Sequence, residues 1–247
     1  MALFRADLHI HTVLSPCGDL SMSPSAIVDA ALERNIQIIA ITDHNSTLQA
    51  PLIKQLGEQR GLAVWMGAEV TTREEAHCVV LMPDETSLSL LQQYLEYHLI
   101  KVENNVDKFG YQLVVDHDEN IVQEYPWLLI TAINQSIDEI AKFVHDRGGV
   151  FIPAHVTRPM FSLVSQLGFI PPDLPADALE LSKHTTYDEF VKGHGRHNKL
   201  PIVRSSDAHF VADIGSVFTN LELETTRFEE FKLALKAIDG RRILNQT

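Results

Sequence analysis

Short apolar runs that end in histidine or a carboxylate recur along this chain, and they limit its fold more than any other feature. Residues 4–10 run into His9-Ile10-His11, and residues 36–42 run into Asp43-His44. The same arrangement returns at Glu69, His77, His155, Asp207 and His209. Because catalytic side chains of α/β barrels lie where parallel strands end, we expect these groups to meet at one end of a single sheet.

The apolar runs are spaced as strands that alternate with helices. Further strand-like runs cover residues 62–70, 77–82, 149–154, 178–181, 201–204 and 216–223. Most are continuous Val, Ile, Leu and Ala stretches, as expected for parallel strands with both faces covered. Ser23 before Pro24 predicts a helix start, and Ser136 with Glu139 predicts a capping box. The pattern predicts an α/β fold with a barrel-like or open parallel sheet.

Residues 83–135 lack the polar strand ends of their neighbours. We expect a helix around residues 88–106, followed by residues 111–115 and an aromatic patch at Tyr125-Pro126-Trp127. We interpret this segment as an insertion that shapes the pocket of one domain spanning residues 1–247.

Composition and charge exclude several classes of protein. Two cysteines are too few for a secreted disulfide scaffold, and no apolar stretch reaches the roughly 18 to 20 residues of a membrane span. The start of the chain carries Arg5 and Asp7, unlike a signal peptide, so we expect a cytoplasmic protein without membrane contact. The net charge of −13 disfavours long nucleic acid, whereas a few local cations and metals can hold a small phosphorylated molecule. The oligomeric state is left open.

Each polar strand end could also have an ordinary structural role. His9 and His11 are two positions apart, so both imidazoles lie on one side of a strand. They could bind a metal ion, or they could be polar residues on the solvent-exposed face of a half-buried strand. Asp43 could cap a helix, although a cap has no need of His44. Glu69 could bridge two cations or be an exposed glutamate, and His77 could be a ligand or a surface residue. Arg158 could bind a phosphate through two hydrogen bonds, or it could form an ion pair with a carboxylate on the surface. Taken jointly, the set favours a site for two or three divalent metal ions.

These motifs, in this order, resemble the PHP family, named for bacterial polymerase domains and histidinol phosphatases. The resemblance rests on His9-Ile10-His11, Thr42-Asp43-His44, Gly67-Ala68-Glu69, His155 and Ser206-Asp207-Ala208-His209, and it covers nearly the whole chain outside residues 83–135. It implies a distorted (β/α)7 TIM-like barrel that holds up to three metals, usually zinc, manganese or iron. Family members hydrolyse phosphomonoesters, some nucleotides and, in polymerase-linked members, DNA ends.

The resemblance also implies a ligand set. His9, His11, Glu69 and Asp207 would hold one metal, and His44 and His209 would hold a second. Glu69 would bridge to a third metal held by His155 and by either His77 or His117. The chain departs from the family after the first motif, where many members have another histidine or aspartate. Cys17 or Asp19 stands there instead, and a thiolate would favour zinc or iron over manganese.

We hypothesise that the chain is a metal-dependent phosphoric ester hydrolase that attacks a small phosphomonoester or nucleotide with a metal-bridged hydroxide. Its catalytic residues would be Glu69, Asp207, His209 and Arg158, with Arg158 on the substrate phosphate. A second hypothesis is an exonuclease-like phosphodiesterase for short oligonucleotides, in which Tyr125 and Trp127 stack on a base. A third is a non-catalytic regulatory module that binds metal or phosphate. His184, His194 and His197 belong to a segment that we interpret as a surface loop.

Overall fold

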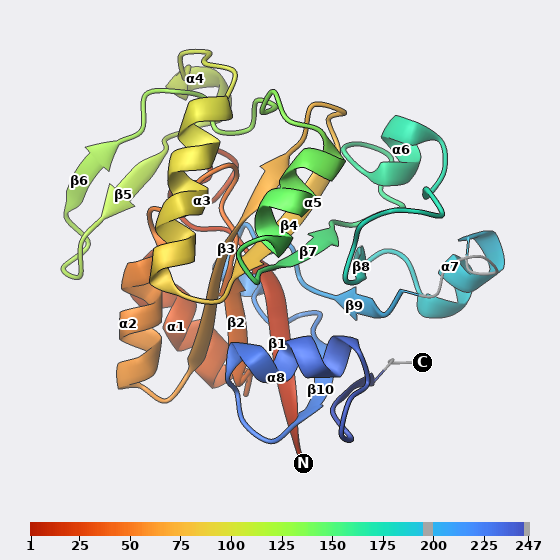
Figure 1. Cartoon of the computed structure of the whole chain (residues 1–247). Helices are drawn as coiled ribbons and strands as arrows, with labels where there is room; N and C mark the ends of the chain where they lie inside the picture. Colours follow the sequence, from red (N-terminus) through yellow and green to blue (C-terminus); the bar gives the residue numbers. More distant parts are fainter. Residues whose placement is uncertain (195–199, 245–247) are drawn as a thin grey trace.

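The computed structural model describes residues 1–194 and 200–244, which form an α/β fold around a strongly curled sheet (Figure 1). The seven-stranded sheet has the order β11-β10-β1-β2-β3-β4-β7, and β5-β6 and β8-β9 form two further pairs. The strands are β1 (Ala2–Ile10), β2 (Ile38–Ile41), β3 (Ala63–Thr71), β4 (His77–Met82), β5 (Leu113–Val115), β6 (Ile121–Glu124), β7 (Val150–Pro153), β8 (Leu179–Leu181), β9 (Ile202–Arg204), β10 (Thr219–Leu223) and β11 (Arg242–Leu244).

Eight α-helices accompany these strands in the described residues. They are α1 (Pro24–Glu33), α2 (Ala50–Gln59), α3 (Glu85–His98), α4 (Val106–Phe109), α5 (Ile137–His145), α6 (Leu163–Leu167), α7 (Tyr187–His194) and α8 (Phe228–Leu235). Both predicted helix starts are confirmed: the Ser23 side chain accepts from the Ala26 amide, and Ser136 forms a complete capping box with Glu139. His194 ends α7, and His197 lies outside the described residues.

Hydrogen bonds continue from the sheet through β8 and β9 back to β1. The Asp177 amide donates to the Phe151 carbonyl at 2.9 Å, which links β7 to the start of β8. After β9, the amide of His11 donates to the Ala208 carbonyl at 3.0 Å, and the amide of Ala208 donates to the His9 carbonyl at 3.2 Å. The expected distorted, TIM-like barrel is therefore confirmed. Its strands are β1, β2, β3, β4, β7, β8 and β9.

The expectation of a parallel sheet is only partly right. β1, β2 and β3 run parallel, whereas β4 is antiparallel to both of its neighbours, β3 and β7. Only residues 72–76 separate β3 from β4, too few for the crossover that a parallel pair needs. The strand β10 also joins β1 antiparallel, so two pairings at β1 and β4 depart from a parallel sheet.

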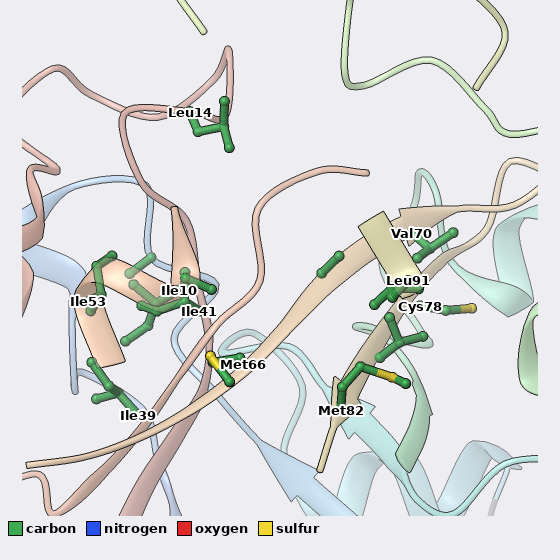
Figure 2. Packing of buried hydrophobic residues seen from close by; sticks show 14 of the residues in the cluster. Ile10, Leu14, Ile39, Ile41, Ile53, Met66, Val70, Cys78, Met82 and Leu91 are labelled. Carbon is green, nitrogen blue, oxygen red and sulfur yellow. The ribbon is translucent and has the colours of Figure 1, made fainter. Parts of the chain in front are cut away.

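The continuous apolar runs are explained by burial of both strand faces. In β2, Ile39 and Ile41 belong to the cluster that includes Ile53 of α2, whereas Ile38 and Ala40 belong to a second cluster. Figure 2 shows Ile53 beside Ile39 and Ile41. The second cluster includes Trp65, whose ring stacks on Phe231 of α8 at 4.9 Å between ring centroids. Full burial of such side chains contributes about 1.5–3 kcal/mol each.

Residues 83–135 leave the barrel after β4 and return before α5. They form α3, α4 and the β5–β6 hairpin, which projects at the upper left of Figure 1. The expected helix ends at His98, because Leu99 takes an extended backbone and bridges to Ile133. Tyr125 is only 6% exposed, and Trp127 packs against the core. The burial of Tyr125 excludes it from stacking on a base. Among the described residues, no helix is long and apolar enough to cross a membrane.

Candidate metal centre

Five imidazoles converge on the carboxylate of Glu69 in β3. Around Oε1 lie His77 Nδ1 at 2.9 Å, His155 Nε2 at 3.1 Å and His9 Nε2 at 3.3 Å. Around Oε2 lie His44 Nδ1 at 3.1 Å and His11 Nε2 at 3.4 Å. The strand ends of β1, β2, β3, β4 and β7 thus bring together residues as far apart in the sequence as His9 and His155.

The chemistry of this cluster fits divalent cations. The six side chains are at most 8% exposed, and His9 Nε2 lies only 3.2 Å from His11 Nε2. Buried polar atoms normally have partners, yet His44 Nδ1 and Asp207 Oδ1 make no hydrogen bond of good geometry. Three sets of donor atoms each lie within 4.8 Å of one another: His9-His11-Glu69, His11-His44-His209 and His44-Glu69-His77. Nitrogen and carboxylate donors in such groups are the ligand types that divalent metal ions take in proteins.

Burial and the internal charges control protonation in the cluster. Burial lowers the pKa of His11 to about 4 and that of His44 well below its usual value. Burial alone would raise the pKa of Glu69, but the imidazoles of His77, His9 and His44 outweigh it and hold this pKa well below the usual value. At neutral pH, His11 and His44 therefore offer unprotonated nitrogens beside an ionised carboxylate, which is the state a metal ion binds.

Asp207 and His209, from the segment after β9, form the solvent side of the cluster. Asp207 Oδ1 lies 3.3 Å from His11 Nε2 and 3.5 Å from His9 Nε2, and the His209 ring stacks on that of His11 at 4.1 Å. The Asp207 side chain is 24% exposed, in contrast to the buried histidines. The Arg158 guanidinium donates to Asp207 Oδ2 at 3.1 Å and is 41% exposed, so a cation stands at the opening of the site.

The structure distinguishes Cys17 from Asp19, the two candidate ligands at the position where the chain departs from the family pattern. Cys17 Sγ lies 3.1 Å from His209 Nε2, at the edge of the His11-His44-His209 set. The Asp19 carboxylate instead accepts from the backbone and hydroxyl of Ser21 on an exposed loop. Asp19 is therefore wrong as a ligand candidate, and Cys17 stays a proposed ligand.

His117 is also wrong as a ligand candidate. It sits between β5 and β6, its side chain is 72% exposed, and its Nε2 pairs with Asp118 at 3.2 Å. His77 is instead the histidine that contacts Glu69, because it opens β4 directly beside β3.

Glu180 of β8 supports the cluster and was missed by sequence reasoning. Its Oε2 accepts from His9 Nδ1 and from the His155 amide, both at 3.0 Å, and the residue is 3% exposed. Burial lowers the pKa of His9, but Glu180 and Glu69 outweigh it and raise this pKa well above the usual value. The signal was available, because Ala178-Leu179-Glu180-Leu181 repeats the carboxylate-in-apolar-strand pattern of Glu69. A carboxylate behind a ligand histidine fixes its tautomer and orientation.

Two buried aspartates hold the loops that carry the clustered histidines. Asp43 accepts from the Thr12 amide and hydroxyl and from Ser15, which rules out helix capping as its role. Asp7 accepts from the amide and hydroxyl of Ser206 and from the Gly215 amide, and so anchors the segment after β9. Burial raises the pKa of each aspartate to about 6.

Three residues of the site adopt left-handed backbone conformations that side chains other than glycine seldom take. The φ angles are 44° at Asn45, 30° at His155 and 52° at Asp207. Such conformations cost of order 1–3 kcal/mol each and persist where the surroundings fix them, often at functional sites. Here Asn45 is held by its amide bonds to the carbonyls of Leu129 and Thr131, both at 2.8 Å.

Comparisons with known proteins agree with this geometry. A family model described as PHP domain matches residues 7–158, and one described as PHP-associated matches residues 195–238. The uncharacterized protein YqxK of Bacillus subtilis is 26% identical over 279 aligned residues, which cover 99% of this chain and 65% of YqxK.

Among solved structures, the lesion-specific endonuclease PfuEndoQ of Pyrococcus furiosus superposes with a TM-score of 0.68 at 19% identity, over 98% of this chain and 58% of PfuEndoQ. Endonuclease Q in complex with a 27-mer duplex that has an abasic lesion at the active site gives a TM-score of 0.65 at 20% identity, with the same shares covered. These structures share the fold, and the chain spans less than two thirds of the length of each relative named here.

Proposed function

The chain belongs to the PHP family, and from that membership we propose that it is a metal-dependent phosphoesterase for a small phosphomonoester or a nucleotide. Its enzyme class is hydrolase. The observation that carries the proposal is the contact of one buried carboxylate, Glu69, with five imidazoles. A structural role alone has no need of so many titratable groups at 8% exposure or less.

The proposed ligands divide into three sets, two of which share Glu69. His9, His11, Glu69 and Asp207 make one, His44 and His209 with Cys17 make the second, and Glu69, His77 and His155 make the third. Bound divalent cations would supply Lewis acidity and lower the pKa of water from about 15.7 towards 7. Glu69 lies in two of the sets, and each of its oxygens faces different imidazoles, which suits a bridging carboxylate.

The remaining residues act on the phosphoryl group and on geometry. Arg158 would turn its exposed guanidinium from Asp207 to the non-bridging phosphate oxygens and balance the charge that grows there. Glu180 keeps His9 oriented, and Asp43 and Asp7 hold the loops on either side. His209, at 21% exposure, is the most exposed histidine of the proposed ligand sets.

A second candidate is a phosphodiesterase that acts on nucleic acid. Its support is the fold shared with endonuclease Q, one structure of which holds a 27-mer duplex with an abasic lesion at the active site. The net charge of −13 argues against long duplexes, but a relative with this fold binds one, so composition alone does not exclude nucleic acid as a substrate.

The test is turnover by protein stripped of metal and reloaded separately with zinc, manganese or iron. Substrates are phosphomonoesters, mononucleotides, a short single strand and a duplex with an abasic site. Metal-dependent phosphate release from the monoesters supports the first function, and strand cleavage without it supports the second. Absence of turnover with every metal and substrate overturns both.

A further inference from the structure

The loop between β7 and α6 presents an aromatic ring beside the buried cluster. The ring of Phe161 stacks on that of His77, with 4.9 Å between ring centroids and 10° between the ring planes. The His77 amide also donates to the Phe161 carbonyl at 2.8 Å. His77 is 6% exposed, whereas Phe161 is 37% exposed, so one ring face covers the histidine and much of the residue still meets solvent.

The backbone of Phe161 is held in a conformation that suits glycine better. Its φ angle is 58°, in the left-handed region where a bulky residue is an outlier. Glycine adopts this region without steric cost. A phenylalanine therefore occupies this position despite local strain, and its two contacts with His77 hold the backbone there.

The same loop carries the cation proposed for phosphate. Arg158 stands three positions before Phe161, and its guanidinium reaches Asp207 at the solvent side of the cluster. Met160, between them, is 60% exposed. One short loop thus offers a cationic group, an apolar side chain and a flat aromatic ring next to the ligand His77.

We propose that Phe161 is a stacking platform for the nucleobase of a nucleotide substrate. The inference rests on the proposed phosphoesterase function and names its substrate class. A nucleobase has a π-face that pairs with an aromatic ring, whereas a sugar or amino-alcohol group offers none. Tyr125 is 6% exposed, whereas Phe161 is 37% exposed, so Phe161 is the better placed of the two for stacking.

The test compares two ligands that differ by the base alone. Thymidine 5′-monophosphate and deoxyribose 5-phosphate share the sugar and the phosphate, and hydrolysis-resistant phosphonate analogues of both allow Kd to be measured on the metal-loaded protein. Wild type is expected to prefer the nucleotide in both Kd and kcat/KM. Phe161→Leu keeps an apolar contact with His77 and removes the aromatic face, so this preference should fall about 5- to 150-fold.

Three comparisons make the result specific. Phe161→Trp should retain the preference, because it restores an aromatic face. Phe161→Gly relieves the left-handed backbone and should give the Leu result with an unchanged or higher Tm, which covers the case of a poorly folded Leu variant. Tyr97→Leu removes an aromatic residue that is 81% exposed on α3 and should leave the preference as in wild type.

If Phe161→Leu and Phe161→Gly keep the preference for the nucleotide over deoxyribose 5-phosphate, with monoester turnover intact, Phe161 is not a stacking platform. The proposed phosphoesterase function is not affected by that result. Loss of turnover on every substrate in wild type overturns the function instead. In that case the Kd comparison still decides the platform, because it needs no hydrolysis.

Discussion

Replacement of Glu180 tests how the histidines proposed as metal ligands are held. Glu180→Ala removes the acceptor of both His9 Nδ1 and the His155 amide. Loss of a carboxylate behind a metal-binding histidine typically weakens metal affinity 10- to 100-fold, or about 1.4–2.7 kcal/mol. The buried His155 N–H is left unpaired as well, which should lower the free energy of unfolding by about 1–3 kcal/mol.

Glu180→Gln separates charge from hydrogen bonding. Oε2 accepts both bonds, so an amide oxygen at that position can keep them while the charge is lost. We expect weaker metal binding with a nearly unchanged free energy of unfolding. Metal affinity is measured by competition with a chelator, and unfolding by urea titration of the metal-free protein. Glu58→Ala, which removes an exposed carboxylate paired with Lys54, is the control. Wild-type metal affinity in Glu180→Ala would refute the reasoning.

Three further results are expected. Arg158→Ala should lower kcat/KM for phosphoesters about 10- to 150-fold, the worth of one charge-assisted hydrogen bond, while metal content by elemental analysis stays at the wild-type value; unchanged kinetics would remove Arg158 from the site. Cys17→Ser should weaken zinc binding relative to manganese binding, and it should abolish the thiolate-to-cobalt charge-transfer absorption of cobalt-loaded protein. Persistence of that band in the variant would exclude Cys17 as the ligand. His145 donates to Asp177 at 2.8 Å, and this bond raises the pKa of His145 above 6.5. The pair therefore stabilises the fold below about pH 6.5, and this contribution is lost as pH rises through the pKa of His145 in the folded state. In urea titrations, His145→Asn should lower the free energy of unfolding more at pH 6 than at pH 9. Equal losses at the two pH values would contradict this expectation.

The sequence predicted much of the site because ligand chemistry leaves a local pattern. A histidine or carboxylate that interrupts an apolar strand is visible without a structure, and His9, Glu69 and His155 were found in this way. Glu180 carries the same signal but stands inside a short strand, with no histidine beside it. The strained backbone at Phe161 has no such pattern, since it depends on a contact with His77, which is distant in the sequence.

The errors arose where distant parts of the chain decide the structure. Helix propensity continues past His98, but Leu99 pairs with Ile133 and the helix ends there. The direction of β4 follows from the length of its connection to β3, which an apolar run does not reveal. Asp19 and Cys17 are two positions apart, and only the fold shows that the loop turns Cys17 towards His209.

The central claim is that Glu69 gathers metal ions that carry out phosphoester hydrolysis. The most direct measurement is metal content per chain and turnover, determined together for wild type and Glu69→Gln, which conserves side-chain volume. We predict two or three divalent ions in wild type, and a joint loss of metal and nearly all turnover in the variant. A Glu69→Gln protein with the wild-type metal content and the wild-type rate would contradict the account.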